Sequence, residues 1–341
     1  MIPDPTRRQR IEVLFDQCSD LPAAQRARFL EVAVAGDQAL RREVEDLLAS
    51  ADRADSTGRL ERIVAAAFEL PRGPRGRPRP GDRYELLEKL GGGGMGTVYK
   101  ANDRQAGGLV ALKFLSDSLA GDPVLKRRFY REAHAAAGLD HAGIGAIHGV
   151  EETEEGRLFI VMPYYDGGTL KDAIGRGPLP IAQAVSCAVQ VAEGLAHAHA
   201  AGVIHRDIKP ANLMFAGDGT LKILDFGIAK IAGEKLTRTG LVLGTLAYMS
   251  PEQAAGGVLD HRTDLWALGV VLHEMLTGRP PFSAPSIELL FRAVRFDDPP
   301  AIRSLRPEAS DEVEAVVNRL LQKDPGLRYP DAATAATALR G

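Results

Sequence analysis

Apolar residues recur at intervals of three and four over residues 6–70. This spacing places them on one face of a helix, as in amphipathic helices that bury one stripe. Pro22, and later Gly36 and Asp37, interrupt the pattern. We therefore predict a small all-α module of short helices in residues 1–70, without a motif that defines its role. Its apolar positions include Ile11, Leu14, Phe15, Cys18, Phe29, Leu30, Val34, Leu40, Val44, Leu47 and Leu48.

The helical pattern stops in residues 71–82, which read PRGPRGRPRPGD. Proline, glycine and arginine without apolar side chains are typical of an extended linker. The arginines could instead bind an acidic surface. The segment is expected to separate the 1–70 module from a larger domain over residues 83–340.

Short segments with alternating or β-branched residues follow at 84–90, 97–101 and 108–115, separated by glycine-rich turns. Helical periodicity dominates from about residue 180 onward. Strands followed by helices suggest a sheet-rich lobe joined to a helical lobe. The predicted fold class is therefore α+β.

Glycines form a candidate phosphate site between two of these strands. Residues 90–98 read LGGGGMGTV, and glycines let backbone N–H groups approach phosphate oxygens closely. A Walker loop would need Lys and Ser or Thr after Gly96, and a dinucleotide-binding turn would open a helix, whereas TVYKA continues as a strand. The pattern favours a phosphate-covering loop between antiparallel strands, with a plain hairpin turn as the alternative.

A lysine lies inside the apolar strand LVALKFL. Alternation places Ala111 and Lys113 on one face, and an ammonium among apolar neighbours needs an anion nearby. Asp122 and Pro123 predict the start of a helix that runs to about residue 138 and carries Glu132 in its apolar stripe. We therefore expect an ion pair between Lys113 and Glu132 that orients the lysine toward nucleotide phosphates.

Two further strings carry the strongest chemical signal: VIHRDIKPANL at 203–213 and ILDFGIA at 223–229. Together they resemble the catalytic and magnesium-binding loops of eukaryotic-like (Hanks-type) serine/threonine protein kinases of the bacterial branch. The resemblance implies that Asp207 accepts the proton of a substrate hydroxyl. It also implies that Asn212 and Asp225 hold Mg²⁺, or Mn²⁺, against the phosphates of ATP.

This resemblance extends over residues 83–340 and implies the bilobal kinase fold, an antiparallel sheet lobe with one main helix followed by a helical lobe. Lys113, Glu132 and Asp207 would serve catalysis together with Lys209. Lys209 in IKPAN and Thr245 in GTLAY are similar to serine/threonine kinases, in which both contact the catalytic aspartate. Tyrosine kinases differ at these positions.

The segment IVMPYYDGGTLKD resembles the kinase hinge that meets adenine. Met162 would be the gatekeeper, and Tyr165 would supply the key backbone donor. Pro163 replaces the usual acidic residue and removes one N–H donor. The implied ATP-contacting residues are Leu90, Gly91, Gly92, Gly93, Gly94, Met95, Gly96, Thr97, Val98, Ala111, Lys113, Met162 and Tyr165.

Beyond the hinge, GTLAYMSPE at 244–252 resembles the end of the kinase activation segment, where Glu252 would pair with Arg328. The stretch TDLWALGVVLHEML is apolar almost all round, which predicts a buried helix. Asp264 at its start would brace the catalytic loop. A simple N-cap role for Asp264 is the alternative.

Threonines in the string KLTRTGLVLGT suggest a control site. Arg206 directly precedes Asp207, and Thr237 and Thr239 lie in a polar stretch. A phosphothreonine carries about 1.5 to 2 negative charges, so pairing with Arg206 would order the segment. We predict autophosphorylation at Thr237, Thr239 or both, and the alternative is that they are ordinary exposed residues.

Composition limits the expected partners and cellular compartment of the chain. A net charge of −3 gives no reason to expect nucleic-acid binding, and two cysteines in 341 residues fit a reducing compartment. The chain has no apolar run of about 18 residues and no signal peptide. We expect a cytoplasmic kinase domain without a membrane segment, and an anchor after Gly341 in a longer protein stays compatible with this.

The expected partners are protein substrates and a second copy, in a homodimer that autophosphorylates in trans. An alternative from another class is a pseudokinase or docking protein that only binds nucleotide. Such a protein would be expected to lack Lys113, Asp207, Asn212 or Asp225, and all four are present.

Overall fold

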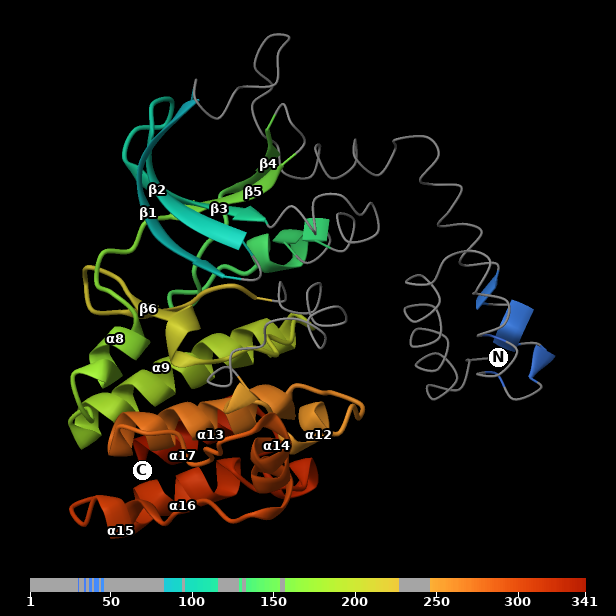
Figure 1. Ribbon diagram of the computed structural model, residues 1–341, viewed down its shortest axis with the longest axis vertical. Coiled ribbons are helices and arrows are strands. Elements are labelled where there is room, and N and C mark those ends of the chain that lie inside the picture. Colours follow the sequence, from blue (N-terminus) through green and yellow to red (C-terminus); the bar gives the residue numbers. More distant parts are fainter. Residues whose placement is uncertain are drawn as a thin grey trace. The chain divides into compact units, whose positions relative to one another are not determined.

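Figure 1 shows the computed structural model of the chain, with a sheet in cyan and green and helices that run from green to red. The structure describes residues 83–93, 96–115, 129–130, 133–153, 157–226 and 246–341, together with individual residues between 30 and 45. The chain divides into two compact units, Met1–Arg75 with Asp122–Arg127, and Gly76–Gly121 with Arg128–Gly341.

A five-stranded antiparallel sheet forms the first lobe of the larger unit, in the order β1-β2-β3-β5-β4. Its strands are β1 Tyr84–Gly93, β2 Gly96–Asp103, β3 Leu109–Leu115, β4 Gly149–Glu152 and β5 Leu158–Pro163. Gly93 pairs with Gly96 at the end of the β1–β2 ladder. The strands expected from alternation are confirmed, and so is the position of the glycine-rich segment between antiparallel strands.

Alternation along β3 decides which side chains enter the core of this lobe. Val110 and Leu112 are buried in an apolar cluster against which Phe114 packs, and residues of opposite parity project to the other face. The ring of Phe114 stacks on Phe159 of β5 with centroids 5.0 Å apart. The predicted division of this strand into two faces, with Lys113 opposite the apolar one, is confirmed.

The second lobe consists of helices and a short hairpin around one apolar core (Figure 1). Its helices are α8 Leu170–Gly175, α9 Ile181–Ala200, α12 Pro251–Ala254, α13 Arg262–Thr277, α14 Ile287–Phe296, α15 Ile302–Leu305, α16 Asp311–Leu320 and α17 Ala332–Arg340. Its described part also contains the 3-10 turns η1 Pro210–Asn212 and η2 Pro325–Leu327 and the strands β6 Leu213–Phe215 and β7 Leu221–Ile223. Polar side chains fix where several helices begin, because each accepts an N–H of the first turn. These caps are Thr169, Ser250, Ser286, Ser310 and Asp331.

Helix α13 is buried on nearly every side. Trp266 is fully buried and stacks on Phe282 with centroids 5.7 Å apart. A Cβ atom at Gly269 would lie only 2.7 Å from the Cβ of Leu320 in α16, so glycine permits the close approach of these two helices. The prediction of a buried helix in this segment is confirmed.

A buried ion pair joins α12 to the segment after η2. The Nη1 and Nη2 atoms of Arg328 donate to the two carboxylate oxygens of Glu252 at 2.7 and 2.8 Å. The Arg328 side chain is 0% exposed and that of Glu252 is 13% exposed. Burial raises the pKa of Glu252, but the bonds and charge of Arg328 outweigh burial and hold the pKa below its ordinary value. The predicted pairing is confirmed.

The N-terminal unit buries apolar residues at the positions where the sequence places helical stripes. Leu30, Val34, Leu40 and Val44 are each no more than 3% exposed. The Leu40 N–H donates to Asp37 Oδ1 at 3.0 Å, so Asp37 caps the helical residues that follow it. The other predicted helices of residues 1–70 and the linker 71–82 lie outside the described residues.

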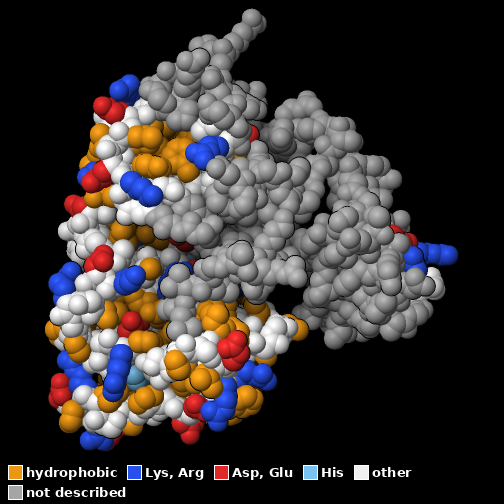
Figure 2. All heavy atoms as spheres, in the orientation of Figure 1, with side chains coloured by type: hydrophobic (Ala, Val, Ile, Leu, Met, Phe, Trp, Pro, Cys, Tyr) orange, Lys and Arg blue, Asp and Glu red, His pale blue; other side chains and the backbone are white. Residues whose placement is uncertain are grey.

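Figure 2 shows Lys, Arg, Asp and Glu side chains interspersed over the described part of the face it presents. Large apolar side chains are also exposed at several positions, among them Leu86 and Leu87 in β1 and Phe296 in α14. Across the residues that the structure describes, no helix combines the length and the apolar character needed to cross a bilayer.

The substitution Glu252→Gln is expected to lower the free energy of unfolding by about 3 kcal/mol at neutral pH, because it leaves the Arg328 guanidinium buried without a counter-charge. Since the pKa of Glu252 is depressed in the folded state, its contribution is complete above the unfolded-state pKa, about 4.3, and is lost as pH falls through the folded value. Urea unfolding at about pH 7 and about pH 3.5 should show the difference between wild type and variant shrinking in acid.

Glu308→Gln provides the matched control. It removes the ion pair between Glu308 and Arg306, in which the Glu308 side chain is 63% exposed. Because water screens such a pair, little change in the free energy of unfolding is expected. Equal losses of stability in both variants would contradict a special role for the buried pair.

Candidate active site

The sheet lobe brings four predicted nucleotide contacts to one face. Directly opposed residues of an antiparallel pair project to the same side. Val98 in β2 is opposite Lys113 in β3, and Ala111 in β3 is opposite Met162 in β5. Because Ala111 and Lys113 are two residues apart on one strand, all four side chains share this face.

Of the other predicted nucleotide contacts, seven are described by the structure and two are not. Leu90, Gly91, Gly92, Gly93, Gly96 and Thr97 belong to β1 and β2, and Tyr165 follows β5 with a phenol whose pKa is raised by burial. Gly94 and Met95 lie outside the described residues, as do Glu132, Thr237, Thr239 and Thr245.

In the catalytic loop, two donors converge on one carboxylate oxygen. Lys209 Nζ lies 2.6 Å from Asp207 Oδ2. Asn212 Nδ2 donates to the same oxygen at 3.0 Å and to the Asp207 carbonyl oxygen at 2.9 Å. These bonds restrict the Asp207 side chain to one orientation, in which Oδ1 is the oxygen left for a further donor.

An ion pair links β3 to the loop after β7. Lys113 Nζ and Asp225 Oδ2 are 2.7 Å apart, and the lysine side chain is 8% exposed. Burial raises the pKa of Asp225, but the attraction of Lys113 outweighs it and holds the pKa below its usual value. The predicted partner, Glu132, is among the residues that the structure does not describe, and a direct pair between Lys113 and Asp225 was not predicted.

His205 connects the loops that carry Asp207 and Asp225. Its Nδ1 accepts the Asp207 N–H at 3.1 Å, and its Nε2 lies 2.8 Å from the carbonyl oxygen of Leu224. A carbonyl can only accept, so Nε2 carries the proton. The ring also packs edge-on against Phe226, with centroids 4.7 Å apart. One imidazole therefore fixes the backbone at both acidic residues.

A fully buried carboxylate in α13 holds the backbone of the catalytic loop. Asp264 Oδ2 accepts the His205 N–H at 2.8 Å, and Oδ1 accepts the Arg206 N–H at 2.7 Å. His199 Nε2 of α9 lies 2.8 Å from Oδ2. Since His261 occupies the N-cap position of α13, the N-cap alternative for Asp264 is wrong and the predicted brace is confirmed.

Comparison with known proteins agrees with this geometry. The family described as protein kinase domain matches residues 84–339. The chain belongs to the protein kinase family. The match begins at the first residue of β1 and ends within α17, so it includes both lobes.

Several relatives of this kinase are bacterial. The chain is 44% identical over 264 residues to serine/threonine-protein kinase PknB of Mycobacterium leprae, covering 75% of this chain and 42% of that protein. It is 42% identical to the probable serine/threonine-protein kinase SCO3848 of Streptomyces coelicolor, covering 74% and 39%. It is 41% identical to serine/threonine-protein kinase PrkC of Bacillus subtilis, covering 73% and 39%. The chain thus spans about two fifths of the length of these relatives.

Among solved structures, the kinase domain of Mycobacterium tuberculosis PknI matches with a TM-score of 0.60 and 30% sequence identity, covering 76% of this chain and 95% of that one. The predicted α+β bilobal fold is therefore confirmed. The sequence-based assignment to the bacterial branch of the serine/threonine protein kinases is confirmed as well.

Protein kinases use ATP with a divalent metal, and the oxygen donors here fit such an ion. Asn212 donates to Asp207 through Nδ2, so the Oδ1 atom of Asn212 points away from Asp207. Lys113 pairs with Oδ2 of Asp225, which leaves Oδ1 of Asp225 for a metal ion. The Leu224 N–H donates to the Asn212 carbonyl at 2.8 Å, which brings the two donors onto adjoining backbone segments. Hard oxygen ligands shared with substrate phosphates suit Mg²⁺. Within the described ranges no group of three or more His, Cys, Asp or Glu could hold a metal unaided.

Arg206 has a strained backbone and an unsatisfied side chain. Its φ is 67°, in the left-handed region that non-glycine residues rarely adopt. Its Nε is buried without a hydrogen-bond partner in the part of the chain that the structure describes. A buried guanidinium nitrogen of this kind is suited to an anionic partner.

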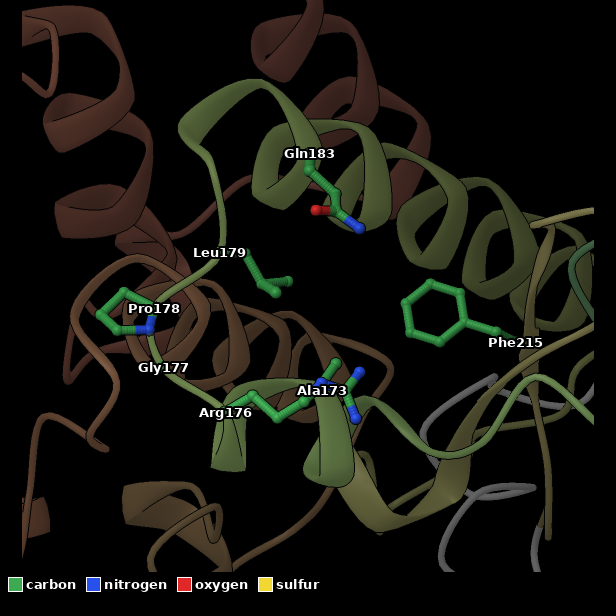
Figure 3. Close-up of a pocket in the computed structure, with 7 residues that line it drawn as sticks. All are labelled: Ala173, Arg176, Gly177, Pro178, Leu179, Gln183 and Phe215. Carbon is green, nitrogen blue, oxygen red and sulfur yellow. The ribbon is translucent and has the colours of Figure 1, made fainter.

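Figure 3 shows a separate cavity of about 370 Å³ at the loop between α8 and α9. Its lining consists of Ala173, Arg176, Gly177, Pro178, Leu179, Gln183 and Phe215. None of the residues predicted to bind nucleotide, metal or substrate belongs to this set. The cavity is therefore distinct from the kinase site.

Sequence patterns assigned no role to His199, His205 or Gln253. His205 belongs to the motif VIHRDIKPANL, but the bond that its Nδ1 accepts and the bond that its Nε2 donates both depend on the fold. Gln253 did carry a signal, because Ser250 and Gln253 have the spacing of a capping box. His199 had none, since its partner Asp264 is distant in sequence.

Asp264→Asn is expected to lower kcat by at least about tenfold and the free energy of unfolding by about 3 kcal/mol. The reason is that an amide presents a donor where two backbone N–H groups and His199 need acceptors. Steady-state peptide phosphorylation and urea unfolding measure the two effects.

Asp260→Asn serves as the control, because its carboxylate pairs with Arg262 at a site where both side chains are at least 31% exposed. Little change is expected there. Normal turnover in the Asp264 variant would show that the loop does not depend on this brace.

Proposed function

We propose that this chain is an active serine/threonine protein kinase that transfers the γ-phosphate of ATP to hydroxyl groups of proteins. The observation that carries the proposal is the arrangement of Lys209 and Asn212 around Asp207, beside the Lys113–Asp225 pair. The names of the bacterial relatives support the same activity. We further propose that residues 83–340 form the catalytic domain, after a linker at 71–82 and a separate helical module at 1–70.

Asp207 is proposed as the base that receives the proton of the substrate hydroxyl. Lys209 and Asn212 hold one carboxylate oxygen, so the other is oriented for the hydroxyl. The hydroxyl oxygen forms a bond to the γ-phosphorus, the bond from that phosphorus to the leaving ADP oxygen breaks, and the proton passes to Asp207. Since phosphoryl transfer needs little covalent help, placing these charges is most of the catalysis.

Lys113 is proposed to bind the nucleotide phosphates. Its side chain shares a sheet face with Val98, Ala111 and Met162, which are proposed as apolar contacts of the nucleotide. Glu132 is proposed as the carboxylate that takes up Lys113 when phosphates and metal occupy Asp225. The remaining proposed contacts are Leu90, Gly91, Gly92, Gly93, Gly94, Met95, Gly96, Thr97 and Tyr165.

Asn212 and Asp225 are proposed to hold Mg²⁺, or Mn²⁺, through their outward oxygens. Such an ion neutralises charge on the phosphate oxygens as the transferred group leaves. Lys209 is proposed to act beside Asp207 on the transferred phosphate, and Thr245 is proposed to support the same aspartate. These two residues are the basis for proposing serine and threonine rather than tyrosine as acceptors.

Control is proposed to act through Arg206. Its Nε is buried without a hydrogen-bond partner among the described residues, which makes it suited to a phosphate on Thr237 or Thr239. Pairing would order the activation segment and open the substrate site. Autophosphorylation between two copies of the kinase is the proposed route.

The test of the proposed function is direct. The purified chain, incubated with ATP, Mg²⁺ and a serine/threonine-containing protein such as casein or myelin basic protein, is expected to yield phosphoserine or phosphothreonine. ATP binding without transfer to any protein, including the kinase itself, would instead support the pseudokinase alternative.

Asp207→Asn is expected to lower kcat by about 10²- to 10⁴-fold while ATP binding stays near the wild-type value, because the base acts on the acceptor and not on the nucleotide. Asp218→Asn is the control, since Asp218 only caps an exposed turn through the Thr220 N–H. Turnover of the Asp207 variant within about tenfold of wild type, roughly 1.4 kcal/mol of barrier, would refute its role as base.

The double substitution Thr237→Ala/Thr239→Ala is expected to slow turnover, because the segment then has no phosphate to pair with Arg206. Intact-mass measurement and peptide mapping after incubation with ATP and Mg²⁺ should place phosphate on one or both threonines of the wild type. A fully active enzyme with an unmodified segment would exclude this form of control.

A further inference from the structure

Gln253 in α12 contacts the backbone of the catalytic loop. Its Nε2 donates to the Arg206 carbonyl oxygen at 2.9 Å. Its Oε1 accepts the Ser250 N–H at 2.9 Å, and its own N–H donates to Ser250 Oγ at 3.2 Å. Both ends of the amide thus meet a partner of the correct kind, which fixes its orientation. One side chain joins the start of α12 to the residue before Asp207.

The peptide group between Arg206 and Asp207 is what this contact fixes. Its oxygen accepts from Gln253, and its N–H donates to His205 Nδ1 at 3.1 Å. A peptide group is planar, so bonds to its oxygen and its N–H together prevent it from rotating. Rotation would move the Cα atom of Asp207 and carry the carboxylate away from Lys209 and Asn212.

The strain at Arg206 makes this restraint necessary. A non-glycine residue at φ 67° is unfavourable unless its surroundings hold it there. Asp264 holds the N–H of Arg206 at 2.7 Å, and Gln253 holds its carbonyl oxygen. If the Gln253 bond is lost, the peptide group after Arg206 is held only through its N–H, by the bond from Asp207 N–H to His205 Nδ1.

We infer that Gln253 is a positioning residue for Asp207, which acts through the Arg206 carbonyl to orient the peptide that carries the catalytic carboxylate. α12 is itself anchored, since Ser250 Oγ lies 2.7 Å from Thr263 Oγ1 of α13. The orientation of Asp207 therefore depends on the folded state of α12, which begins within the last residues of the activation segment. The inference rests on the proposed kinase function.

Gln253→Glu separates this role from the role of Gln253 in capping α12. The carboxylate keeps an acceptor for the Ser250 N–H, as glutamate does in many capping boxes. Toward Arg206, however, it presents an acceptor to an acceptor, so the bond to the catalytic loop is lost. Gln253→Leu removes both interactions. Both substitutions are made in the Thr237→Ala/Thr239→Ala parent and checked by intact mass, so that all enzymes have the same phosphorylation state.

Gln253→Glu is expected to lower kcat about ten- to a hundredfold, with the KM for ATP and the thermal midpoint unchanged from the parent. Gln253→Leu is expected to lower kcat similarly and also to lower the thermal midpoint, because the Ser250 N–H loses its acceptor and the capping box of α12 keeps only the bond to Ser250 Oγ. Gln322→Glu is the matched control, since Gln322 Nε2 donates only to the Asn318 carbonyl at the end of α16. Its kcat should equal that of the parent.

A kcat of Gln253→Glu within about twofold of the parent would overturn the inference. A fall in kcat matched by an equal loss of ATP affinity or of folded protein would also overturn it, because general loss of structure would then explain the effect. An inactive wild-type kinase would contradict the proposed function itself, and the inference would fall with it.

Discussion

Three hydrogen bonds converge on the buried carboxylate of Asp264, and the geometry of the catalytic loop depends on them. Taking a carboxylate out of water is costly unless donors replace the lost hydration. Here the donors are two consecutive backbone N–H groups, of His205 and Arg206, together with the imidazole of His199. Because Asp264 belongs to α13, a helix that is buried on nearly every side, the backbone of the loop is fixed to the core of the helical lobe.

From this anchor, short polar contacts lead outward to every proposed catalytic group that the structure describes. His205 holds the backbone at Asp207 and, through Leu224, the backbone before Asp225. Asp225 then pairs with Lys113 of the sheet lobe, so its charge is stabilised despite burial. Most of these contacts involve backbone atoms, which move less than long side chains and so hold the reacting groups more precisely.

The same loops store strain. Arg206 and Asp225 both have positive φ, a conformation that costs about 1–3 kcal/mol for such residues. Burial of apolar surface in helices such as α13 offsets this cost. The strained positions lie next to or at the residues proposed to act on the hydroxyl and the metal. The buried core of the helical lobe therefore permits strained backbone conformations in the loops that carry these residues.

The sequence by itself determined the family, the two lobes, the strands β1 to β3, the buried helix α13 and the identity of the candidate catalytic residues. Local patterns suffice for these features, because alternation, helical periodicity and motif strings depend on neighbouring residues. Only the tertiary structure decided that Lys113 faces Asp225, that His199 completes the Asp264 brace and that Gln253 reaches Arg206. Each of those contacts joins residues that are distant in sequence, and the packing of different elements against one another sets their separation.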